Sequence, residues 1–409
     1  MSKKSPQLRF EGFTDDWEER KLSEGTSKIG DGLHGTPNYS DNGDVFFING
    51  NNLVNGKIVI TKETKLVTES NQSKDDKLLN MDTILMSING TIGNLAWYNN
   101  ERVMLGKSAA YLTVSNFDKK FIFSYLQTST IKNYFLNNLT GTTIKNLGLK
   151  TIRDTTLFVP TLEEQQKIGS LFKQLDDTIA LHQRKLDLLK EQKKGYLQKM
   201  FPKTGEKIPE LRFAGFADDW EERKLSDLFI KGGSGGTPKS TNKAFYDGDI
   251  PFLGISDITK SNGFINNTEK HISSDGLNSS AAWIVSKGAI SLAMYASVGK
   301  LAILNIDAAT SQAFYNMIFD DYDLRDLVYQ RLNKANELSE WNKLISTGTQ
   351  SNLNADKVKN FQMYLPKNHD EIKLISTFFK QIDNTIALHQ RKLDLLKERK
   401  KGFLQKMFV

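Results

Sequence analysis

Two glycine-containing stretches of the first half have the composition of phosphate-binding loops. Gly30-Asp-Gly32-Leu-His-Gly35 has the glycine spacing of dinucleotide sites, but Thr36-Pro37-Asn38 follows where a helix should begin. Gly106-Lys107-Ser108 resembles the end of a nucleoside-triphosphate loop, but Glu101 stands where that loop needs glycine. Neither stretch therefore predicts a nucleotide site.

Other catalytic chemistry has equally little support. The chain has no cysteine, which excludes thiol nucleophiles, disulfides and thiolate zinc sites. We find no Asn-Pro-Pro-Tyr or Asp-Pro-Pro-Tyr element for amino-methyl transfer and no paired-carboxylate nuclease motif. His182 and His389 recur at equivalent positions. They are open to two interpretations, a metal or pH switch and a polar residue that fixes helix register, and we favour the second. We therefore predict no catalytic residue and no metal site.

Composition describes a globular chain of two or three domains. Its 409 residues are 38% hydrophobic and 25% charged, and the mean hydropathy is -0.45. A net charge of +7 and a pI near 9.1 permit a nucleic-acid partner without demanding one. No apolar run is long enough to span a bilayer, and no secretory signal follows Met1, so we expect a cytoplasmic location without membrane association.

An internal repeat organises the chain. Residues 6–23 recur as 209–226 with 15 of 18 positions identical, and residues 175–201 recur as 382–408 with 23 of 27 identical. The regions between them share only short elements, such as Gly35-Thr36-Pro37 and Gly236-Thr237-Pro238. The chain therefore consists of two half-proteins. The framework blocks are duplicated, and the regions between them differ in sequence.

Each variable region predicts a mixed α/β domain. Short β-rich runs alternate with Gly, Asn and Asp, one helical stretch follows at 118–136 or 324–344, and a final strand closes the domain. The boundaries that we predict are a framework segment, a first variable domain, a central helix, a repeated framework segment, a second variable domain and a C-terminal helix: 1–24, 25–160, 161–208, 209–227, 228–366 and 367–409.

The repeated blocks predict two long helices. Apolar residues recur at alternating steps of four and three, which is a heptad seam. The seam residues are Ile168, Phe172, Leu175, Ile179, His182, Leu186 and Leu189, and in the copy Ile375, Phe379, Ile382, Ile386, His389, Leu393 and Leu396. A two-fold relation between the halves predicts that the helices pack antiparallel as a coiled coil. By the same symmetry the end of the second helix should meet the first block at Leu8, which brings the two ends of the chain together.

Four framework residues are each open to two interpretations, a structural role and a partner-docking role. Trp17 and Trp220 lie in repeated acidic blocks, and they are either packing anchors or docking sites for a partner subunit. Lys190 and Lys397 lie in charge runs that are either solvated helix faces or partner contacts. We carry all four as docking candidates.

The layout resembles the specificity subunit of type I restriction-modification systems. The resemblance rests on the repeated Leu-Arg-Phe-x-Gly-Phe-x-Asp-Asp-Trp-Glu-x-Arg-Lys-Leu block, the Gly-Thr-Pro elements and helices that end in Gln-Lys-Met-Phe. It implies that the variable regions are target-recognition domains, each reading half of a split double-stranded DNA sequence. It also implies that the helices set the spacing and dock two methyltransferase subunits, and that motor-nuclease subunits join them. The subunit would have no catalytic residue, and S-adenosylmethionine, ATP and Mg²⁺ would serve the assembled complex alone.

DNA-facing residues are predicted only from loop position and chemistry. The candidates are Asn89, Lys107, Thr142 and Lys145 in the first domain and Lys239, Lys243, Tyr295, Ser297, Lys300 and Gln350 in the second. The variable domains carry formal charges of +3 (residues 25–160) and 0 (residues 228–366), so we expect modest sequence-independent affinity. The bases read, the spacer length and the activity of the system are not determined by the sequence.

Two other classes of protein compete with this interpretation. A stand-alone DNA-modifying enzyme would need a cofactor or metal motif and would modify DNA as the pure chain. A coiled-coil scaffold without a DNA function would show no sequence-dependent DNA affinity, even with partner subunits present.

Overall fold

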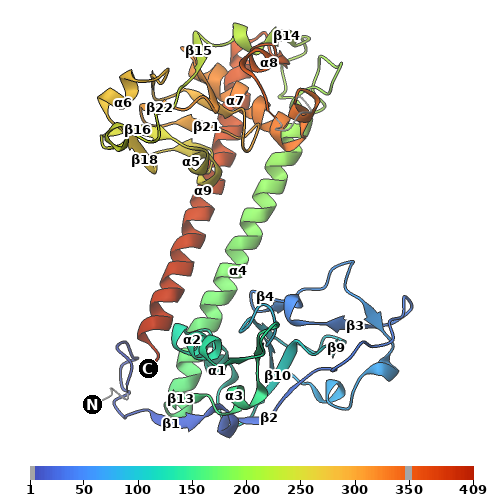
Figure 1. Cartoon of the computed structure of the whole chain (residues 1–409). Coiled ribbons are helices and arrows are strands. Elements are labelled where there is room, and N and C mark those ends of the chain that lie inside the picture. Colours follow the sequence, from blue (N-terminus) through green and yellow to red (C-terminus); the bar gives the residue numbers. More distant parts are fainter. Residues whose placement is uncertain (1–4, 346–351) are drawn as a thin grey trace. The chain divides into compact units, whose positions relative to one another are not determined.

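A computed structural model of the chain describes residues 5–345 and 352–409 (Figure 1). It divides into two compact units: Met1–His182 with Lys392–Val409, which we call unit 1, and Gln183–Arg391, which we call unit 2. The division passes through two long helices, α4 (Leu162–Lys199) and α9 (His369–Lys406). Each unit therefore contains a variable domain and part of each helix.

Two sheets form the variable domain of unit 1. The larger is antiparallel, and its strand order is β2 (Thr26–Asp31), β10 (Ala109–Val114), β7 (Thr83–Ser87), β8 (Leu95–Trp97). All five residues of β7 are buried, because β7 lies inside the sheet with both faces covered. The smaller sheet has the order β6 (Leu66–Val67), β3 (Val45–Ile48), β9 (Val103–Leu105), with β3 and β9 parallel. Two hairpins complete the domain, β4 (Leu53–Val54) with β5 (Lys57–Ile58) and β11 (Leu139–Thr140) with β12 (Asn146–Leu147).

Unit 2 repeats this topology with little shared sequence and with one more strand at the edge of each sheet. Its larger sheet has the order β15 (Lys231–Ser234), β23 (Phe314–Ile318), β20 (Ile290–Ala293), β21 (Leu301–Leu304), β17 (Phe264–Ile265). Its smaller sheet has the order β18 (Lys270–Ile272), β16 (Ile250–Leu253), β22 (Ala308–Thr310), β19 (Ile284–Val285), with β16 and β22 parallel. The mixed α/β class predicted for both domains is confirmed.

The repeated blocks become edge pairs of the framework. Each block supplies one strand, and the last strand of the following variable domain pairs with it in antiparallel fashion. The pairs are β1 (Glu18–Lys21) with β13 (Thr156–Val159) and β14 (Glu221–Lys224) with β24 (Gln362–Leu365). This pairing closes each variable domain on its own framework.

The helical stretch predicted at 118–136 is two helices, so that prediction is wrong in detail. Asp118 caps α1 (Lys119–Tyr125), and the Thr128 side chain accepts a hydrogen bond from the Ile131 amide to start α2 (Ser129–Asn137). In unit 2, α7 (Tyr322–Glu337) ends before the predicted residue 344, because Ser339 has a left-handed φ of 55°. The shorter helices are α3 (Leu149–Arg153), α5 (Ile255–Lys260), α6 (Ser274–Asn278) and α8 (Ala355–Lys359).

Within each unit the two long helices run antiparallel, as predicted. In unit 1, Phe172 packs against Phe408 with ring centroids 5.5 Å apart, and Lys400 Nζ lies 2.5 Å from Asp176 Oδ1. Residue numbers therefore rise along α4 as they fall along α9. In unit 2 the equivalent contacts are Phe201 with Phe379 (6.0 Å) and Lys193 Nζ with Asp383 Oδ1 (2.7 Å).

The predicted return of the chain to its first block is also confirmed. The Leu8 amide donates to the Lys406 carbonyl at 2.8 Å, and the equivalent Leu211 amide donates to the Lys199 carbonyl at 2.8 Å. Each predicted seam residue of α4 and α9 is buried or half-buried. Across residues 5–345 and 352–409, no helix is long and apolar enough to cross a membrane.

Candidate nucleic-acid interface and repeated framework

One edge of the first variable domain gathers all four of its DNA-facing candidates. Asn89 lies in the loop between β7 and β8 and forms an antiparallel bridge with Asn146, next to Lys145. The Ile88 amide of the same loop donates to the Ser108 carbonyl at 2.9 Å, beside Lys107. Lys107, Thr142 and Lys145 are exposed and Asn89 is half-buried. Three loops that are distant in the sequence thus meet at one edge.

The second domain gathers its candidates in the same way. Tyr295, Ser297 and Lys300 lie in the loop between β20 and β21 and are exposed. The Met294 amide of this loop donates to the Ala313 carbonyl at 2.8 Å. The neighbouring Gln312 accepts a 2.6 Å hydrogen bond from Thr237 of the Gly-Thr-Pro element. Gln350, another candidate of the second domain, lies outside the described residues.

Lys239 and Lys243 follow the Gly-Thr-Pro element and are both exposed. Lys243 helps to line a cavity of about 710 Å³ together with Thr237, Tyr246, Lys270 and His271. Tyr246 donates a 2.7 Å hydrogen bond to the Pro238 carbonyl, which holds one wall in place. Asp247 and Glu269 also line this cavity, so its charge is mixed and it does not define an anion site.

A bidentate ion pair attaches each repeated block to its long helix. Arg9 donates to both carboxylate oxygens of Glu164 at 2.7 and 2.8 Å, and Arg212 does the same to Glu371 at 2.6 and 2.8 Å. Both carboxylates are fully buried. A buried carboxylate needs its cation, so these Arg–Glu clamps fix the start of α4 and α9 against the framework.

A glutamine from each variable domain joins the Lys–Asp pairs between the long helices. Gln330 of α7 donates to Asp383 at 2.7 Å, and Lys400 donates to Gln127, which lies between α1 and α2, at 2.7 Å. The four groups are mostly buried. These polar contacts set the position of each variable domain on its half of the helix pair.

The docking role considered for Trp17 and Trp220 is corrected by their burial. Each is 1% exposed. Trp17 packs edge-on against Phe121 and Phe408, and Trp220 packs edge-on against Phe201. They are packing anchors, because no partner can contact a side chain that the core encloses. Lys190 and Lys397 are exposed and remain docking candidates.

The repeated helix sequence leaves identical leucines in solvent. Leu181 and Leu388 are each 67% exposed, and Leu188 and Leu395 are 53% and 57% exposed. The packing of this chain therefore leaves more than half of each of these leucines open to solvent. Their repetition indicates a surface that exists twice.

Two helical glycines are repeated in the same way. Gly195 and Gly402 lie inside α4 and α9, and a Cβ atom at either position would meet nothing within 4 Å. Glycine inside a helix costs about 0.5–1 kcal/mol relative to alanine. The packing of the described residues does not require it at either position.

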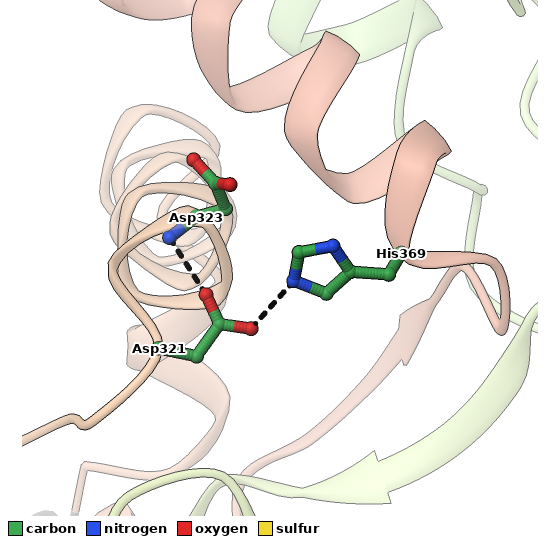
Figure 2. Close-up of side chains that lie close together, drawn as sticks. All are labelled: Asp321, Asp323 and His369. Carbon is green, nitrogen blue, oxygen red and sulfur yellow. Dashed lines mark hydrogen bonds and ion pairs between the residues drawn. The ribbon is translucent and has the colours of Figure 1, made fainter.

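One cluster in unit 2 has the composition of a metal site but the geometry of a helix cap (Figure 2). One Asp321 oxygen accepts from the Asp323 and Leu324 amides at 2.8 and 3.1 Å, and the other lies 2.8 Å from His369 Nε2. Burial raises the pKa of Asp321, but these hydrogen bonds outweigh it and hold that pKa below its ordinary value. The N-termini of α7 and α9 meet here, and their partial positive charge disfavours a cation.

Lys334 holds the segment that follows α4 from inside the core of unit 2. Its ammonium group donates to the Phe201 and Pro202 carbonyls at 3.1 and 2.9 Å. Burial, followed by the nearby charge of Arg331, lowers the pKa of Lys334 to about 8. The side chain is a structural donor and does not face solvent.

Sequence reasoning did not find the Arg–Glu clamps, the Lys–Asp pairs or Lys334. The clamps and pairs did leave a signal, since Arg9, Glu164, Asp176 and Lys193 are each identical in the second copy. Lys334 left none, because the equivalent carbonyl in unit 1, that of Val409, accepts its hydrogen bond from Tyr125.

The geometry agrees with comparisons to known proteins. The model of the type I restriction modification DNA specificity domain matches twice, at residues 14–191 and 217–398. The chain therefore belongs to the family of type I restriction-modification specificity proteins. The curated relatives that it matches are specificity subunits.

Two of these relatives are the type I restriction enzyme MjaIX specificity subunit of Methanocaldococcus jannaschii and the HindI specificity subunit of Haemophilus influenzae. They are 28% and 29% identical over 44% and 41% of this chain. The matches span 41% and 37% of the relatives' own length.

Two solved structures share the fold over nearly the whole chain. The type I restriction-modification S subunit from M. genitalium covers 99% of both chains with a TM-score of 0.66 and 14% identity. A chain from a study of complex assembly and conformational transition of the type I R-M system covers 96% of this chain and 97% of its own, with a TM-score of 0.52 and 16% identity.

Proposed function

We propose that the chain is the DNA-recognition subunit of a type I restriction-modification complex. Each variable domain reads one half of a bipartite double-stranded target, and the long helices set the spacing between the halves. The observation that carries this proposal is the duplicated framework, in which the same clamp, strand pair and helix contacts hold two domains of different sequence. Two variable domains of different sequence, held by the same framework contacts, suit a target made of two different half-sites.

Two methyltransferase subunits dock on the repeated helices in this proposal, and motor-nuclease subunits complete the restriction complex. The support is the exposed leucine pairs and the helical glycines, which occur twice with equal surroundings. S-adenosylmethionine is expected on the methyltransferase subunits, and ATP and Mg²⁺ on the motor-nuclease subunits. Because the substrate is DNA, the complex would act in the cytoplasm.

Recognition is tested by exchanging one domain. Residues 25–160 are replaced by the equivalent domain of another family member, and methylated sites are mapped by sequencing in cells that carry the methyltransferase partner. The expected result is that one half of the methylated motif changes while the other half and the gap are retained. If both halves change, or if methylation does not depend on this chain, the proposal is overturned.

Docking is tested by charge reversal at two equivalent exposed positions. Lys190→Glu combined with Lys397→Glu should weaken assembly and leave thermal stability unchanged, because both side chains are exposed. Native mass measurement should count two partner subunits for the unmodified chain. A single partner, or an unchanged complex in the double variant, would contradict the docking surface.

A further inference from the structure

Two loops of otherwise divergent domains are held by the same hydrogen bonds. The loops are 88–94 between β7 and β8 and 294–300 between β20 and β21, at equivalent places in the two larger sheets. Five backbone hydrogen bonds of the first loop recur at equivalent positions in the second, each given from the donor amide to the acceptor carbonyl. In the first loop they are Ser87 to Asn94, Gly93 to Ser87, Asn94 to Thr91, Ile88 to Ser108 and Leu147 to Ile88. In the second loop they are, in the same order, Ala293 to Lys300, Gly299 to Ala293, Lys300 to Ser297, Met294 to Ala313 and Leu353 to Met294.

The same bonds hold tips that differ in sequence and in conformation. The first tip is Asn89-Gly-Thr-Ile92 and the second is Tyr295-Ala-Ser-Val298. The first turns through Gly90 with a φ of 70°, and the second turns one equivalent position later, through Ser297 with a φ of 61°. A left-handed serine costs roughly 1–2 kcal/mol. Backbone strain of this kind is concentrated at functional positions.

Both tips are open to solvent, while the residue that precedes each is buried. Ile88 and Met294 are 2% and 3% exposed, whereas residues 90–91 and 295–297 are exposed. The loop is therefore anchored by one apolar side chain and presents the next residues outward.

The charge around the tips suits an anionic partner. Segments 88–94, 106–108 and 141–147 contain Lys107 and Lys145 and no acidic residue. Segments 235–240, 294–300 and 311–313 contain Lys239 and Lys300 and again no acidic residue. Elsewhere the two domains are rich in carboxylates, so these edges combine exposed polar tips with lysines that can reach phosphates.

We infer that the tips 89–92 and 295–298 are the specificity-determining segments of the two domains and that each contacts base edges in its own half-site. This inference rests on the proposed function and deepens it. A fixed backbone frame keeps the approach to DNA constant, and the exchangeable tip determines which hydrogen bonds and apolar contacts reach the bases.

The test is a reciprocal exchange within the chain. One variant carries Tyr-Ala-Ser-Val at 89–92, and the other carries Asn-Gly-Thr-Ile at 295–298. Each is expressed with the methyltransferase partner, and methylated sites are sequenced. We expect the first variant to change bases only in the half-site of the first domain, and the second variant only in the other half-site, with the same gap.

A matched control changes the buried residue of the same loop. Ile88→Met introduces the residue that unit 2 has at the equivalent position and should leave both half-sites unchanged. Hydrogen exchange of β7 and β8 shows whether an exchanged loop keeps its frame. If a frame is lost, Asn89→Ala and Tyr295→Ala replace the exchange, and each should reduce discrimination at a base of its own half-site by roughly 5- to 150-fold.

The outcomes separate this inference from the proposed function. If the unmodified chain directs methylation to a bipartite site but intact tip variants leave both half-sites unchanged, the tips do not determine specificity and the function stands. The same conclusion follows if one tip alters both half-sites. If the unmodified chain directs no bipartite methylation, the proposed function fails as well.

Discussion

At the scale of single residues, the Arg–Glu clamps are long-range polar contacts of the repeated framework that recur in both copies. Each clamp joins residues about 155 positions apart through two short hydrogen bonds to a buried carboxylate. Sequence identity between the copies marks these residues, but only their burial explains it. A buried carboxylate that loses its cation is left as an uncompensated charge.

Arg9→Met should therefore destabilise unit 1 by about 3–5 kcal/mol, because Glu164 keeps its charge in the core. Hydrogen exchange of amides in unit 1 measures the loss, and amides of unit 2 serve as the internal control. Adding Glu164→Leu should recover most of the stability, since apolar replacements of buried ion pairs are often neutral. Arg212→Met should show the mirror result in unit 2. Equal losses of protection in both units would contradict a local clamp.

Lys334 gives unit 2 a dependence on pH with a defined sign. Its pKa is about 8 in the folded chain and 10.5 as the ordinary value, so between these pH values the unfolded chain binds more protons. Stability from this group therefore rises with pH between 8 and 10.5, by at most about 1.4 kcal/mol per pH unit. Chemical unfolding at several pH values should show this rise in the unmodified chain relative to Lys334→Met. Parallel curves for the two proteins would refute the assignment.

At the scale of elements, α4 and α9 combine an internal seam with an external surface. The heptad pattern identified the seam residues, which the structure places in buried or half-buried positions. The exposed leucines and the two glycines lie outside that pattern. The described residues leave more than half of each leucine open to solvent, and a Cβ atom added at either glycine would meet nothing within 4 Å. In these helices, residues that are repeated in both copies but are not buried indicate a surface for an external partner.

Replacing both Gly195 and Gly402 by alanine tests that surface. Alanine removes a helix penalty of about 0.5–1 kcal/mol at each site, so the isolated chain should melt at a higher temperature. If a partner helix approaches the backbone there, the added methyl groups should at the same time weaken assembly with the methyltransferase subunit. Thermal melting and partner titration measure the two effects. Higher stability with unchanged assembly would show that the glycines have no docking role.

At the scale of the whole molecule, the helices should act as a ruler between half-sites, whose centres we expect about one helical turn, near 34–36 Å, apart. An insertion between Pro160 and Ile168 is unsuitable, because Glu164 is clamped there and Gln165 bonds the Pro160 carbonyl. Four residues added after His182 and four after Arg391 fall at the two points where the chain passes from one unit to the other, so they leave each unit's own segments uninterrupted.

The double insertion adds about 6 Å and a rotation of about 40° to each helix. This length is close to two base pairs at about 3.4 Å each. The expected outcome, read by sequencing methylated DNA, is a longer gap with both half-sites preserved. A changed half-site would show that recognition and spacing are not separable.

The amino-acid sequence alone determined the duplication, the mixed α/β class, the two seams and the membership of the family. The first three depend on local periodicity or on comparison of one segment with another, and the family depends on comparison with other proteins. None of these requires knowledge of the fold. It also placed Asn89, Tyr295 and their neighbours on loops. The sequence could not distinguish packing anchors from docking residues. The structure shows that Trp17 is a packing anchor, because its side chain is only 1% exposed.

Only the tertiary structure decided which distant residues meet. The Arg9–Glu164 clamp, the Lys–Asp pairs and the common frame of loops 88–94 and 294–300 join segments that share no local pattern. The split of the predicted helix at Thr128 likewise depends on a side-chain cap competing with continued helix. Long-range pairing is set by burial and hydrogen-bond satisfaction across the whole core, and a local sequence pattern does not contain that information.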